Sequence, residues 1–341
     1  MIEVTKPGLL TTIQDLGRRG YQKYGVSPGG AADMLAHRLA NIAIGNVADA
    51  ATLEMTLQGD ELSLQEAALI SITGADMNPE IDGKPLPMWR PVYVEKGKKL
   101  LFRNAGQGLR TYVAIEGGIQ GDLFLGSTST YLSMEAGGYS GRALKEGDML
   151  QKNGRYSLNE EISDRLKHQT NDQGFAYTPW RLPDPSFFQE EIVPEIRVFP
   201  GPHYQLFDAE SRQAFERGAY QTGSKSDRMG IRFDGEKLTL RNQEEIISEP
   251  VTFGTIQVPA NGQPILLLAD RQTTGGYPKL AQVASVDFSK VAQLRPGEET
   301  KFRMITHREA EQLFLCFEDR IQQCALAVRR KVREEMKDGK Y

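Results

Sequence analysis

Short apolar segments separated by glycine turns fill the first 150 residues, and they restrict the fold more than any other feature of the sequence. The segments 53–57 and 61–64 alternate apolar and polar side chains, as paired, half-buried strands do. Further candidate strands span 68–73, 91–95, 99–103 and 110–116. Among them, 31–44 has apolar residues at helical spacing. Strands this short and this closely spaced predict a mainly β fold with a few helices, of the barrel or sandwich type.

The same order of segments returns after residue 195. Five pairs of segments match weakly and keep their order: 2–8 with 196–202, 31–44 with 204–217, 57–64 with 233–240, 112–118 with 265–276, and 144–148 with 294–298. Such colinear repetition predicts one fold used twice by internal duplication. We therefore expect a first domain at 1–150 and a second at 195–305. The polar, proline-containing stretch 151–194 is interpreted as a linker that carries a short helix near 160–167.

The last segment, 306–341, is predicted to contain a C-terminal amphipathic helix from about residue 307 to 337. Its apolar residues recur at three and four positions and form one stripe: Phe314, Phe317, Ile321, Cys324 and Val328. This stripe packs on the chain's own core or docks a partner protein, and the sequence leaves both open. The two cysteines, Cys316 and Cys324, would lie about 12 Å apart on this helix, which is too far for a disulfide.

Composition excludes several classes of function. The chain has 341 residues, 39% of them hydrophobic, and a formal net charge of −4, which predicts a soluble protein of about two domains. It has no long basic run for nucleic acid and no apolar stretch long enough to cross a membrane. The N-terminus does not resemble a signal peptide, so we expect a cytoplasmic location. Four scattered histidines and two cysteines give no metal-ligand spacing, and we recognise no metal ligands.

One candidate binding segment follows the apolar run 265–268, which predicts a strand buried on both faces. Polar groups and a Gly-Gly pair come directly after it, and a glycine-rich turn fed by a rigid strand is a usual place for binding groups. We take Asp270, Arg271 and Lys279 as candidate catalytic groups. The candidate substrate-binding residues here are Gln272, Thr273, Thr274, Gly275, Gly276 and Tyr277. Alternatively, the segment is a hairpin loop in which Asp270 and Arg271 pair with each other.

A second candidate segment precedes the expected strand 231–233. Ser226, Asp227 and Arg228 form either an anion clamp or a capping turn with an internal Asp–Arg pair, and the sequence favours neither. We take Asp227 and Arg228 as further catalytic candidates and Ser226 as a substrate-binding candidate.

Three more substrate-binding candidates lie near the N-terminus. Asp15 and Arg18 belong to a turn-rich stretch, where they either form a salt bridge or face a ligand. Asp33 either begins the helical segment 31–44, where a carboxylate suits the positive end of the helix dipole, or contacts a ligand. The chain has no glycine-rich loop ending in Lys-Ser/Thr, so we do not expect it to bind ATP by such a loop on its own.

Six stretches carry a resemblance to a known family: Gln14-Asp15-Leu16-Gly17-Arg18 with Gly20-Tyr21, Ala40-Asn41 with Gly45-Asn46, Thr73-Gly74-Ala75-Asp76, Ser226-Asp227-Arg228-Met229-Gly230, Ser248-Glu249-Pro250, and Ala269 to Pro278. In these the chain resembles the biotin-dependent carboxyltransferase and allophanate hydrolase subunit 2 family, and within it the KipA-like C subunits of 5-oxoprolinase. The resemblance covers residues 1 to about 305. Where members usually have Val-Pro-x-Ser-Gly-x-Met-Asp, this chain has Gly29 and Ala32 in place of the serine and the methionine.

The resemblance implies two cyclophilin-like β-barrel domains and a role as one component of an ATP-dependent 5-oxoprolinase complex, which opens the lactam of 5-oxoproline to give L-glutamate. It further implies two partners, the KipI-like B subunit and the A subunit of 5-oxoprolinase, with ATP used by the complex. Arg271, Arg228 and Lys279 would then stabilise negative charge on the small-molecule substrate, since cations and preorganised donors do so. Asp227 and Asp270 would orient those cations or transfer protons.

Two alternatives belong to other classes of function. One is a regulatory protein that binds and antagonises a KipI-like inhibitor of a histidine kinase. The other is a carboxyltransferase of the urea amidolyase type, although the chain has no fused biotin-carboxylase or biotin-carrier segment.

Overall fold

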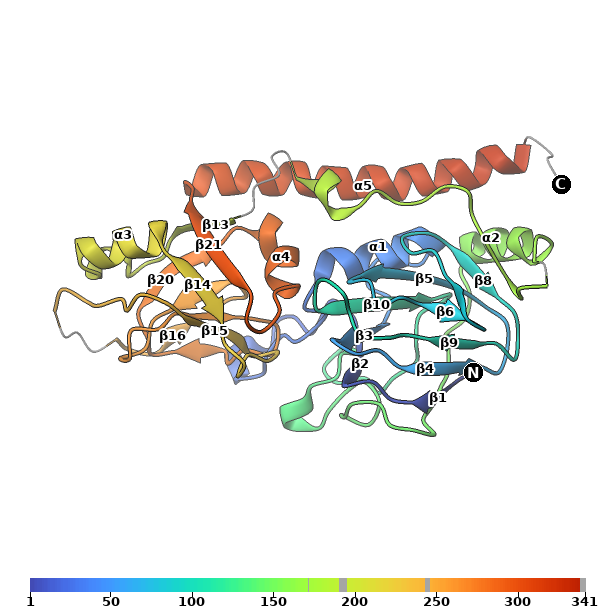
Figure 1. The fold of residues 1–341 in the computed structure, drawn as a ribbon, viewed down its shortest axis with the longest axis horizontal. Coiled ribbons are helices and arrows are strands. Elements are labelled where there is room, and N and C mark those ends of the chain that lie inside the picture. The colour runs from blue at the N-terminus through green and yellow to red at the C-terminus, as the bar shows by residue number, and fades with distance from the viewer. Residues whose placement is uncertain (171, 190–194, 243–245, 338–341) are drawn as a thin grey trace. The chain divides into compact units, whose positions relative to one another are not determined.

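The computed structural model describes residues 1–170, 172–189, 195–242 and 246–337 (Figure 1). The chain forms two compact units. The first comprises Met1–Gly17, Asp33–Phe187 and the chain from Asp319 on, and the second comprises Arg18–Ala32 and Phe188–Glu318. These units differ from the expected domains in three places, one of which is that the expected C-terminal segment 306–341 is divided between them after Glu318. Residues 18–32 belong to the second unit, and most of the expected linker, up to Phe187, belongs to the first.

Two six-stranded sheets make up the first unit, and neighbouring strands in both run antiparallel. One sheet has the order β11 (Met149–Leu150), β1 (Ile2–Lys6), β4 (Glu61–Leu64), β9 (Lys99–Leu101), β6 (Glu80–Ile81), β7 (Lys84–Pro85). The other has the order β12 (Phe175–Tyr177), β8 (Val92–Val94), β5 (Ala68–Gly74), β10 (Arg110–Ile115), β3 (Thr52–Thr56), β2 (Leu10–Gln14). Side chains from both sheets share one apolar core.

The burial of each strand follows from what covers it. In β4 only Leu62 and Leu64 are buried, so one face of this strand meets the core and the other does not. In β10 every residue is buried, because α1 (Met34–Ile44) packs on the face of β5 and β10 that points away from the core. This helix ends at Gly45, whose φ of +80° suits glycine.

The expected linker is largely folded. α2 (Ser157–Lys167) lies close to the predicted short helix and packs against β5 and β8. Its Ile162 and Leu166 are buried on one face. β12 then pairs with β8 and extends the second sheet. A few apolar residues at helical and strand spacing therefore bind this stretch to the first unit, although its overall composition is polar.

The second unit is a closed barrel of seven strands, in the order β13 (Ile196–Pro200), β20 (Lys279–Val283), β17 (Thr255–Gln257), β18 (Ile265–Leu267), β15 (Gly230–Asp234), β14 (Ala219–Thr222), β21 (Glu299–Met304). β21 closes the barrel by pairing parallel with β13 and antiparallel with β14. α3 (Ala209–Arg217) packs on β21 and sends Phe215 into the core, where its ring stacks on Phe302 with centroids 4.8 Å apart. Such aromatic pairs stabilise a core beyond their buried area.

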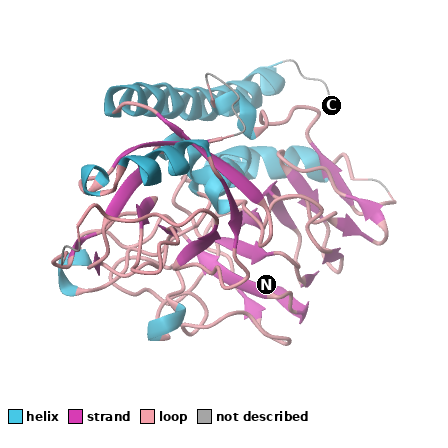
Figure 2. Ribbon diagram, turned by 60° about the vertical axis from the view of Figure 1, so that its left-hand side comes forward, coloured by secondary structure: helices cyan, strands magenta, loops and turns pink. Residues whose placement is uncertain are grey.

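The remaining short elements are β16 (Glu249–Pro250), β19 (Thr274–Gly275), α4 (Phe288–Ala292), η1 (Gln22–Tyr24), η2 (Leu132–Met134), η3 (Pro185–Phe188), η4 (Tyr204–Leu206) and η5 (Ser285–Asp287). Strands outnumber helices in both described units; Figure 2 colours the strands magenta and the helices cyan. The predicted mainly β class with a barrel and a C-terminal helix is confirmed, whereas the cyclophilin-like topology stays a prediction.

Strand pairing follows the predicted repeat in part. β10 lies between β3 and β5 in the first unit, and β18 lies between β15 and β17 in the second. Of the segments matched in sequence, 57–64 follows β3, and 233–240 begins with the last two residues of β15. The pairing differs at β1, which pairs antiparallel with β11, whereas β13 pairs parallel with β21.

The C-terminal helix α5 (His307–Lys337) has the predicted bounds. Thr306 and Glu309 begin it with reciprocal side-chain to backbone hydrogen bonds. Four residues of the stripe, from Phe317 to Val328, are buried, so these contact the chain's own residues, while Phe314 at the N-terminal end is 40% exposed. Both cysteines are free thiols, as expected. Within the described ranges, no helix combines the length and apolar character needed to cross a membrane.

Asp60 links two turns of the first unit through a buried carboxyl group. Its Oδ1 accepts hydrogen bonds from the Gly8 N–H and from Thr11 Oγ1, the latter at 2.9 Å. Burial raises the pKa of this carboxyl from 3.8 to about 6, and the two hydrogen bonds oppose the rise only in part. Because the folded protein holds this proton more tightly than the unfolded chain, the stability contributed by this group is present below the unfolded pKa and is lost as the pH rises through the folded pKa.

Asp60→Asn removes this titration and keeps the Oδ1 acceptor. We compare the free energy of unfolding of Asp60→Asn with that of wild type at each pH. The difference, variant minus wild type, should be about 1.4 kcal/mol larger at about pH 8 than at about pH 5, because wild type loses this stability as the Asp60 carboxyl ionises. Urea denaturation of both proteins at the two pH values measures this change. Glu146→Gln, at an exposed carboxylate of the same unit, is the control and should show no such change. If the difference in the free energy of unfolding between Asp60→Asn and wild type is the same at both pH values, the raised pKa of Asp60 is contradicted.

Candidate functional site

The pairing of β15 with β18 in the second unit brings two candidate segments together. Gly230 at the start of β15 lies opposite Leu267 at the end of β18. Because the strands are antiparallel, the residues just after β18 lie beside those just before β15. The Asp270 N–H accordingly donates to the Arg228 carbonyl at 2.9 Å. Strand register therefore joins the segments around 228 and 270 into one site.

Arg228 and Asp270 form a buried ion pair across these strands. Arg228 Nε donates to Asp270 Oδ2 at 2.8 Å, and Nη2 donates to Oδ1 at 3.1 Å. Both side chains are buried. Arg228 Nη2 also donates to the carbonyl of Gly30 at 2.7 Å. Neither of the two alternative pairs, Asp270 with Arg271 and Asp227 with Arg228, is seen, because Asp270 and Arg228 pair with each other across the strands.

Arg271 has a different environment. Its side chain is 7% exposed, and its Nε and Nη1 donate to the carbonyls of Val251 and Leu268 at 3.4 and 3.1 Å. Neither bond uses Nη2. Burial lowers the pKa of Arg271 to about 10, and the charge of Asp270 opposes this shift. Within the described ranges no carboxylate forms an ion pair with this guanidinium, so its direct partners are backbone carbonyls and the charge of Asp270 acts on it without a hydrogen bond.

Residues 18–32, which we call the 18–32 segment, are hydrogen-bonded to the backbone around Asp270 and Arg271. Gln22 Nε2 donates to the carbonyls of Val251 and Thr273 at 2.9 and 3.3 Å. Ser27 Oγ donates to the Ala269 carbonyl at 3.1 Å. The carbonyl of Val251 thus accepts from both Gln22 and Arg271. The 18–32 segment therefore helps to set the position of the Arg271 guanidinium.

Gln22, Ser27 and Gly30 also belong to this site, although the sequence did not predict them. Their residue types carry no catalytic signal, and the available hint was the place of two of them in the family-like stretch 26–33. Arg18 was predicted, and it is buried in the same unit. Gly29 has a φ of +62° and lies close to the Arg18 side chain. A Cβ added at Gly29 would lie 2.8 Å from Arg18 Nη1 and 3.8 Å from Asp270 Oδ1. Glycine at 29 therefore makes room for the Arg18 guanidinium.

Several predicted site residues hold the local structure through hydrogen bonds, and their contact with a ligand stays a prediction. Asp33 is the N-cap of α1, with Oδ1 accepting from the Ala36 N–H at 3.0 Å. Asp15 belongs to the first unit, where it accepts hydrogen bonds from Ser127 Oγ at 2.7 Å and from the Thr128 N–H at 2.6 Å. Asp15 thereby holds the loop 127–129, and its pairing or shared ligand with Arg18 stays a prediction.

The turn before β15 and the end of the 265–279 segment are also held by internal bonds. Asp227 Oδ1 accepts from the N–H groups of Met229 and Gly230 at 2.7 and 3.2 Å, and Ser226 Oγ donates to the Gly223 carbonyl at 2.7 Å. Asp227 therefore caps this turn. Lys279 is buried and donates to Glu249 Oε2 at 2.8 Å, which lowers the pKa of that carboxyl.

The rest of the 265–279 segment lies apart from the ion pair. Thr274 and Gly275 form β19, which pairs with β16, and a Cβ on Gly275 would approach Gln257 Oε1 to 2.8 Å. Gln272, Thr274, Gly276 and Tyr277 are exposed, and Thr273 is half-buried. A cavity of about 870 Å³ in the second unit is lined by Gly276, Tyr277 and Pro278 together with Phe207, Lys237, Leu238, Leu240, Val258 and neighbouring residues. Its volume is in the usual range for small-molecule sites.

Across the described part of the chain, no group of three or more His, Cys, Asp or Glu side chains could hold a metal ion. The arrangement in the second unit can instead bind an anion. Arg271 supplies a buried positive charge, and the Arg228–Asp270 pair fixes the loop that carries it.

Comparison with known proteins places the chain in a family. The family model described as "Carboxyltransferase domain, subdomain A and B" matches residues 24–304. The chain is 37% identical over 313 residues to the C subunit of 5-oxoprolinase from Haemophilus influenzae, covering 92% of this chain and 94% of the relative. It is 35% identical over 311 residues to the Escherichia coli protein of the same name, covering 91% and 93%.

A solved structure shows the same fold. The crystal structure of the Kluyveromyces lactis urea carboxylase superposes with a TM-score of 0.83 at 28% sequence identity, covering 95% of this chain and 29% of that one. Family match, sequence identity and fold agree, and the chain belongs to the family defined by the carboxyltransferase domain, subdomains A and B.

Proposed function

We propose that this chain is one component of an ATP-dependent 5-oxoprolinase complex, which converts 5-oxoproline to L-glutamate, and that Arg271 binds the substrate carboxylate. Two relatives named as the C subunit of 5-oxoprolinase, similar over nearly their whole lengths, support the reaction. The observation that carries the site is the buried guanidinium of Arg271, which has carbonyl partners and no ion pair with a carboxylate within the described ranges. Buried charges are normally paired, so such a cation is suited to an anionic ligand.

The reaction requires an amide in an unstrained five-membered ring to be opened by water. ATP transfers its terminal phosphoryl group to the amide oxygen and leaves as ADP, which makes the carbonyl carbon more electrophilic. A first water adds to this carbon, the ring C–N bond breaks, and the nitrogen takes up protons to become the amine of glutamate. The resulting acyl phosphate is hydrolysed by a second water to the side-chain carboxylate and inorganic phosphate. Since this chain shows no phosphate-binding loop, we assign the ATP site to the KipI-like B subunit or to the A subunit of the complex.

Arg271 would act by position and charge. Its carbonyl partners occupy Nε and Nη1, so a carboxylate would be bound through Nη2. Its pKa of about 10 keeps it charged at neutral pH. Placing an anion beside it would raise that pKa again and compensate the buried charge. The Arg228–Asp270 pair and the bonds from Gln22 and Ser27 would hold the loop in place while substrate binds.

Reconstitution tests the proposal. The purified chain is mixed with the KipI-like B subunit and the A subunit, and glutamate release from 5-oxoproline is measured with and without ATP. We expect ATP-dependent release with all three proteins and none from this chain alone. Absence of release from a complex shown by light scattering to be assembled would contradict the proposal.

A second candidate function has one specific observation in its favour, the fold shared with the urea carboxylase of K. lactis. In that case the chain would transfer a carboxyl group from carboxybiotin to a urea-like acceptor. The same protein is therefore incubated with free carboxybiotin and urea. Urea-dependent loss of carboxybiotin would favour this second function over the first.

Gly29→Ala should disturb the site specifically. An alanine at 29 places its Cβ 2.8 Å from Arg18 Nη1, so the buried guanidinium must move. We expect the rate of the assembled complex to fall by about tenfold or more, as positioning changes of this size do. Gly25→Ala is the matched control, because Gly25 also has a positive φ, +81°, but no atom within 4 Å of the added Cβ.

Both alanine variants should lose about 1 to 2 kcal/mol of stability from the left-handed backbone conformation. Only Gly29→Ala should lose activity at temperatures where both are folded. Equal rates for the two variants would show that the position of Arg18 does not matter for the reaction.

A further inference from the structure

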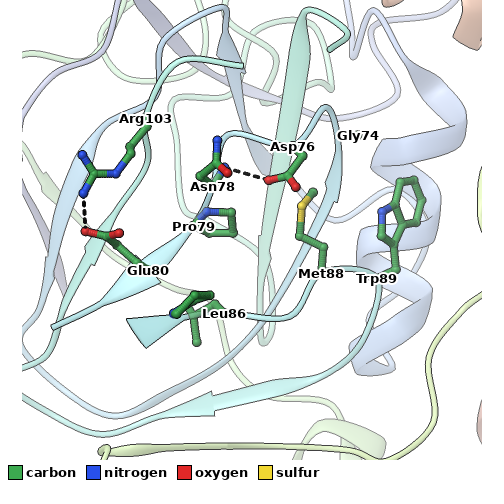
Figure 3. Close-up of a pocket in the computed structure, with 10 residues that line it drawn as sticks. Gly74, Asp76, Asn78, Pro79, Glu80, Leu86, Met88, Trp89 and Arg103 are labelled. Atoms are coloured by element: carbon green, nitrogen blue, oxygen red, sulfur yellow. Dashed lines mark hydrogen bonds and ion pairs between the residues drawn. The ribbon is translucent and has the colours of Figure 1, made fainter. Parts of the chain in front are cut away.

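A second pocket lies in the first unit (Figure 3), in a part of the chain that the proposed reaction does not use. It has a cavity volume of about 480 Å³ and lies where β5 ends at Gly74, beside β6 and β7. We call it the Asp76 pocket and define it by its six main lining residues: Asp76, Pro79, Leu86, Met88, Trp89 and Arg103. Asp76 is the last residue of the family-like stretch 73–76, and this stretch belongs to the first unit.

The charges that line the Asp76 pocket do not cancel. Glu80 Oε1 accepts from Arg103 Nη2 at 2.8 Å, so these two residues neutralise each other. Asp76 Oδ1 accepts from the Asn78 N–H at 2.7 Å. The hydrogen bonds found for Asp76 in the described ranges do not involve Oδ2, and this carboxylate is exposed. The pocket therefore has one carboxylate oxygen available and one net negative charge.

The remaining lining is apolar and includes an aromatic ring. Pro79 and Leu86 are buried, and Met88 and Trp89 are half-buried, so their side chains form the wall. An indole face attracts cations, and a thioether adapts to ligands of different shape. An anion would find only Arg103, which Glu80 already neutralises.

The backbone at this wall is held in an unusual conformation. Trp89 has a φ of +62°, a left-handed conformation that bulky residues rarely adopt. Two hydrogen bonds keep it there, from the Trp89 N–H to the Ile72 carbonyl at 2.8 Å and from the Leu182 N–H to the Trp89 carbonyl at 2.7 Å. Residues held in such conformations cluster at ligand sites, which agrees with a binding role for this wall.

We propose that the Asp76 pocket binds a small organic cation, a protonated amine on an apolar or aromatic body. The ammonium group is bound by Asp76 Oδ2, and the body packs on Trp89 and Met88. The lining residues of this pocket belong to the first unit, whereas the residues of the proposed reaction belong to the second.

Four probes with one aromatic body and different charge test the ligand class: phenethylammonium, phenylalanine, 3-phenylpropanol and 3-phenylpropionate. Isothermal titration calorimetry on the full chain measures each dissociation constant. We expect phenethylammonium to bind about tenfold or more tightly than the neutral and anionic probes, the size of one desolvated cation–π and charge contact. Equal affinity for the cation and the anion, or no binding of the cation at millimolar concentration, would overturn the proposal.

Two variants locate the site. Asp76→Asn keeps the Oδ1 acceptor for the Asn78 N–H and removes the charge, and it should weaken phenethylammonium binding about tenfold. Glu146→Gln removes an exposed charge elsewhere in the first unit and should leave the binding unchanged. If both variants bind as wild type does, the assignment to Asp76 is wrong.

The indole of Trp89 gives an independent readout. The chain has two tryptophans, so Trp180→Phe leaves Trp89 as the remaining one. Addition of phenethylammonium should then change the fluorescence emission of Trp89 with the dissociation constant found by calorimetry. Calorimetric binding without any change in this emission would show that the cation binds elsewhere.

Discussion

Arg271→Lys is expected to lower kcat/KM of the proposed 5-oxoprolinase complex by about a hundredfold or more. Arg271 donates from two nitrogens to the carbonyls of Val251 and Leu268, and in the proposed function its third nitrogen, Nη2, binds the substrate carboxylate. A lysine has one ammonium group and cannot hold these positions together. By analogy with the loss of one charge-stabilising donor, this corresponds to about 2 to 4 kcal/mol of transition-state stabilisation. Steady-state rates of glutamate release as a function of 5-oxoproline concentration measure it.

Stability separates this effect from a structural one. Lysine at 271 keeps a positive charge, so we expect only a small loss of stability, about 1 to 2 kcal/mol from the lost carbonyl hydrogen bonds. Arg232→Lys, at an exposed arginine of β15, is the control and should retain the wild-type rate. Turnover within a few-fold of wild type in Arg271→Lys would show that Arg271 does not bind the substrate.

Asp287→Asn is expected to lower the free energy of unfolding by about 3 to 5 kcal/mol. Asp287 is buried and accepts from Arg197 Nε at 2.9 Å, from Arg197 Nη2 at 2.7 Å and from the Arg197 N–H at 2.8 Å. Lys290 adds a second cation at 3.3 Å. An asparagine has no charge and turns an N–H₂ group toward these donors. The Arg197 guanidinium would then stay buried without its counter-charge.

An exposed pair of the same kind is the control for Asp287→Asn. Asp82 accepts from Lys98 at 2.8 Å, and its side chain is 56% exposed. Its φ of +51° is a conformation that asparagine tolerates. Asp82→Asn should therefore change the stability by no more than about 1 kcal/mol. Urea denaturation of both variants measures the two effects, and equal losses would contradict the role of burial.

Local patterns were sufficient for much of the fold. Alternation of side chains in 61–64 and the stripe from Phe317 to Val328 predicted β4 and α5, because strand and helix periods are properties of consecutive residues. The stretch 151–187 shows the limit of this approach. Its average composition is polar, yet Ile162 and Leu166 on one face of α2 are enough to attach it to β5 and β8.

The sequence by itself determined which chemical groups this protein presents: an arginine and an aspartate after a buried strand, a second such pair before another, and glycines that admit close approach. Only the tertiary structure decided their partners. Asp270 pairs with Arg228, 42 residues away, and not with its neighbour Arg271, because the antiparallel register of β15 and β18 puts the first two side by side. The tertiary structure also decided that Asp15 contacts the loop 127–129 and that Asp33 caps α1. It brought Gln22 and Ser27 to the site. Pairings between distant residues follow from strand register and chain topology, which no local pattern of residues encodes.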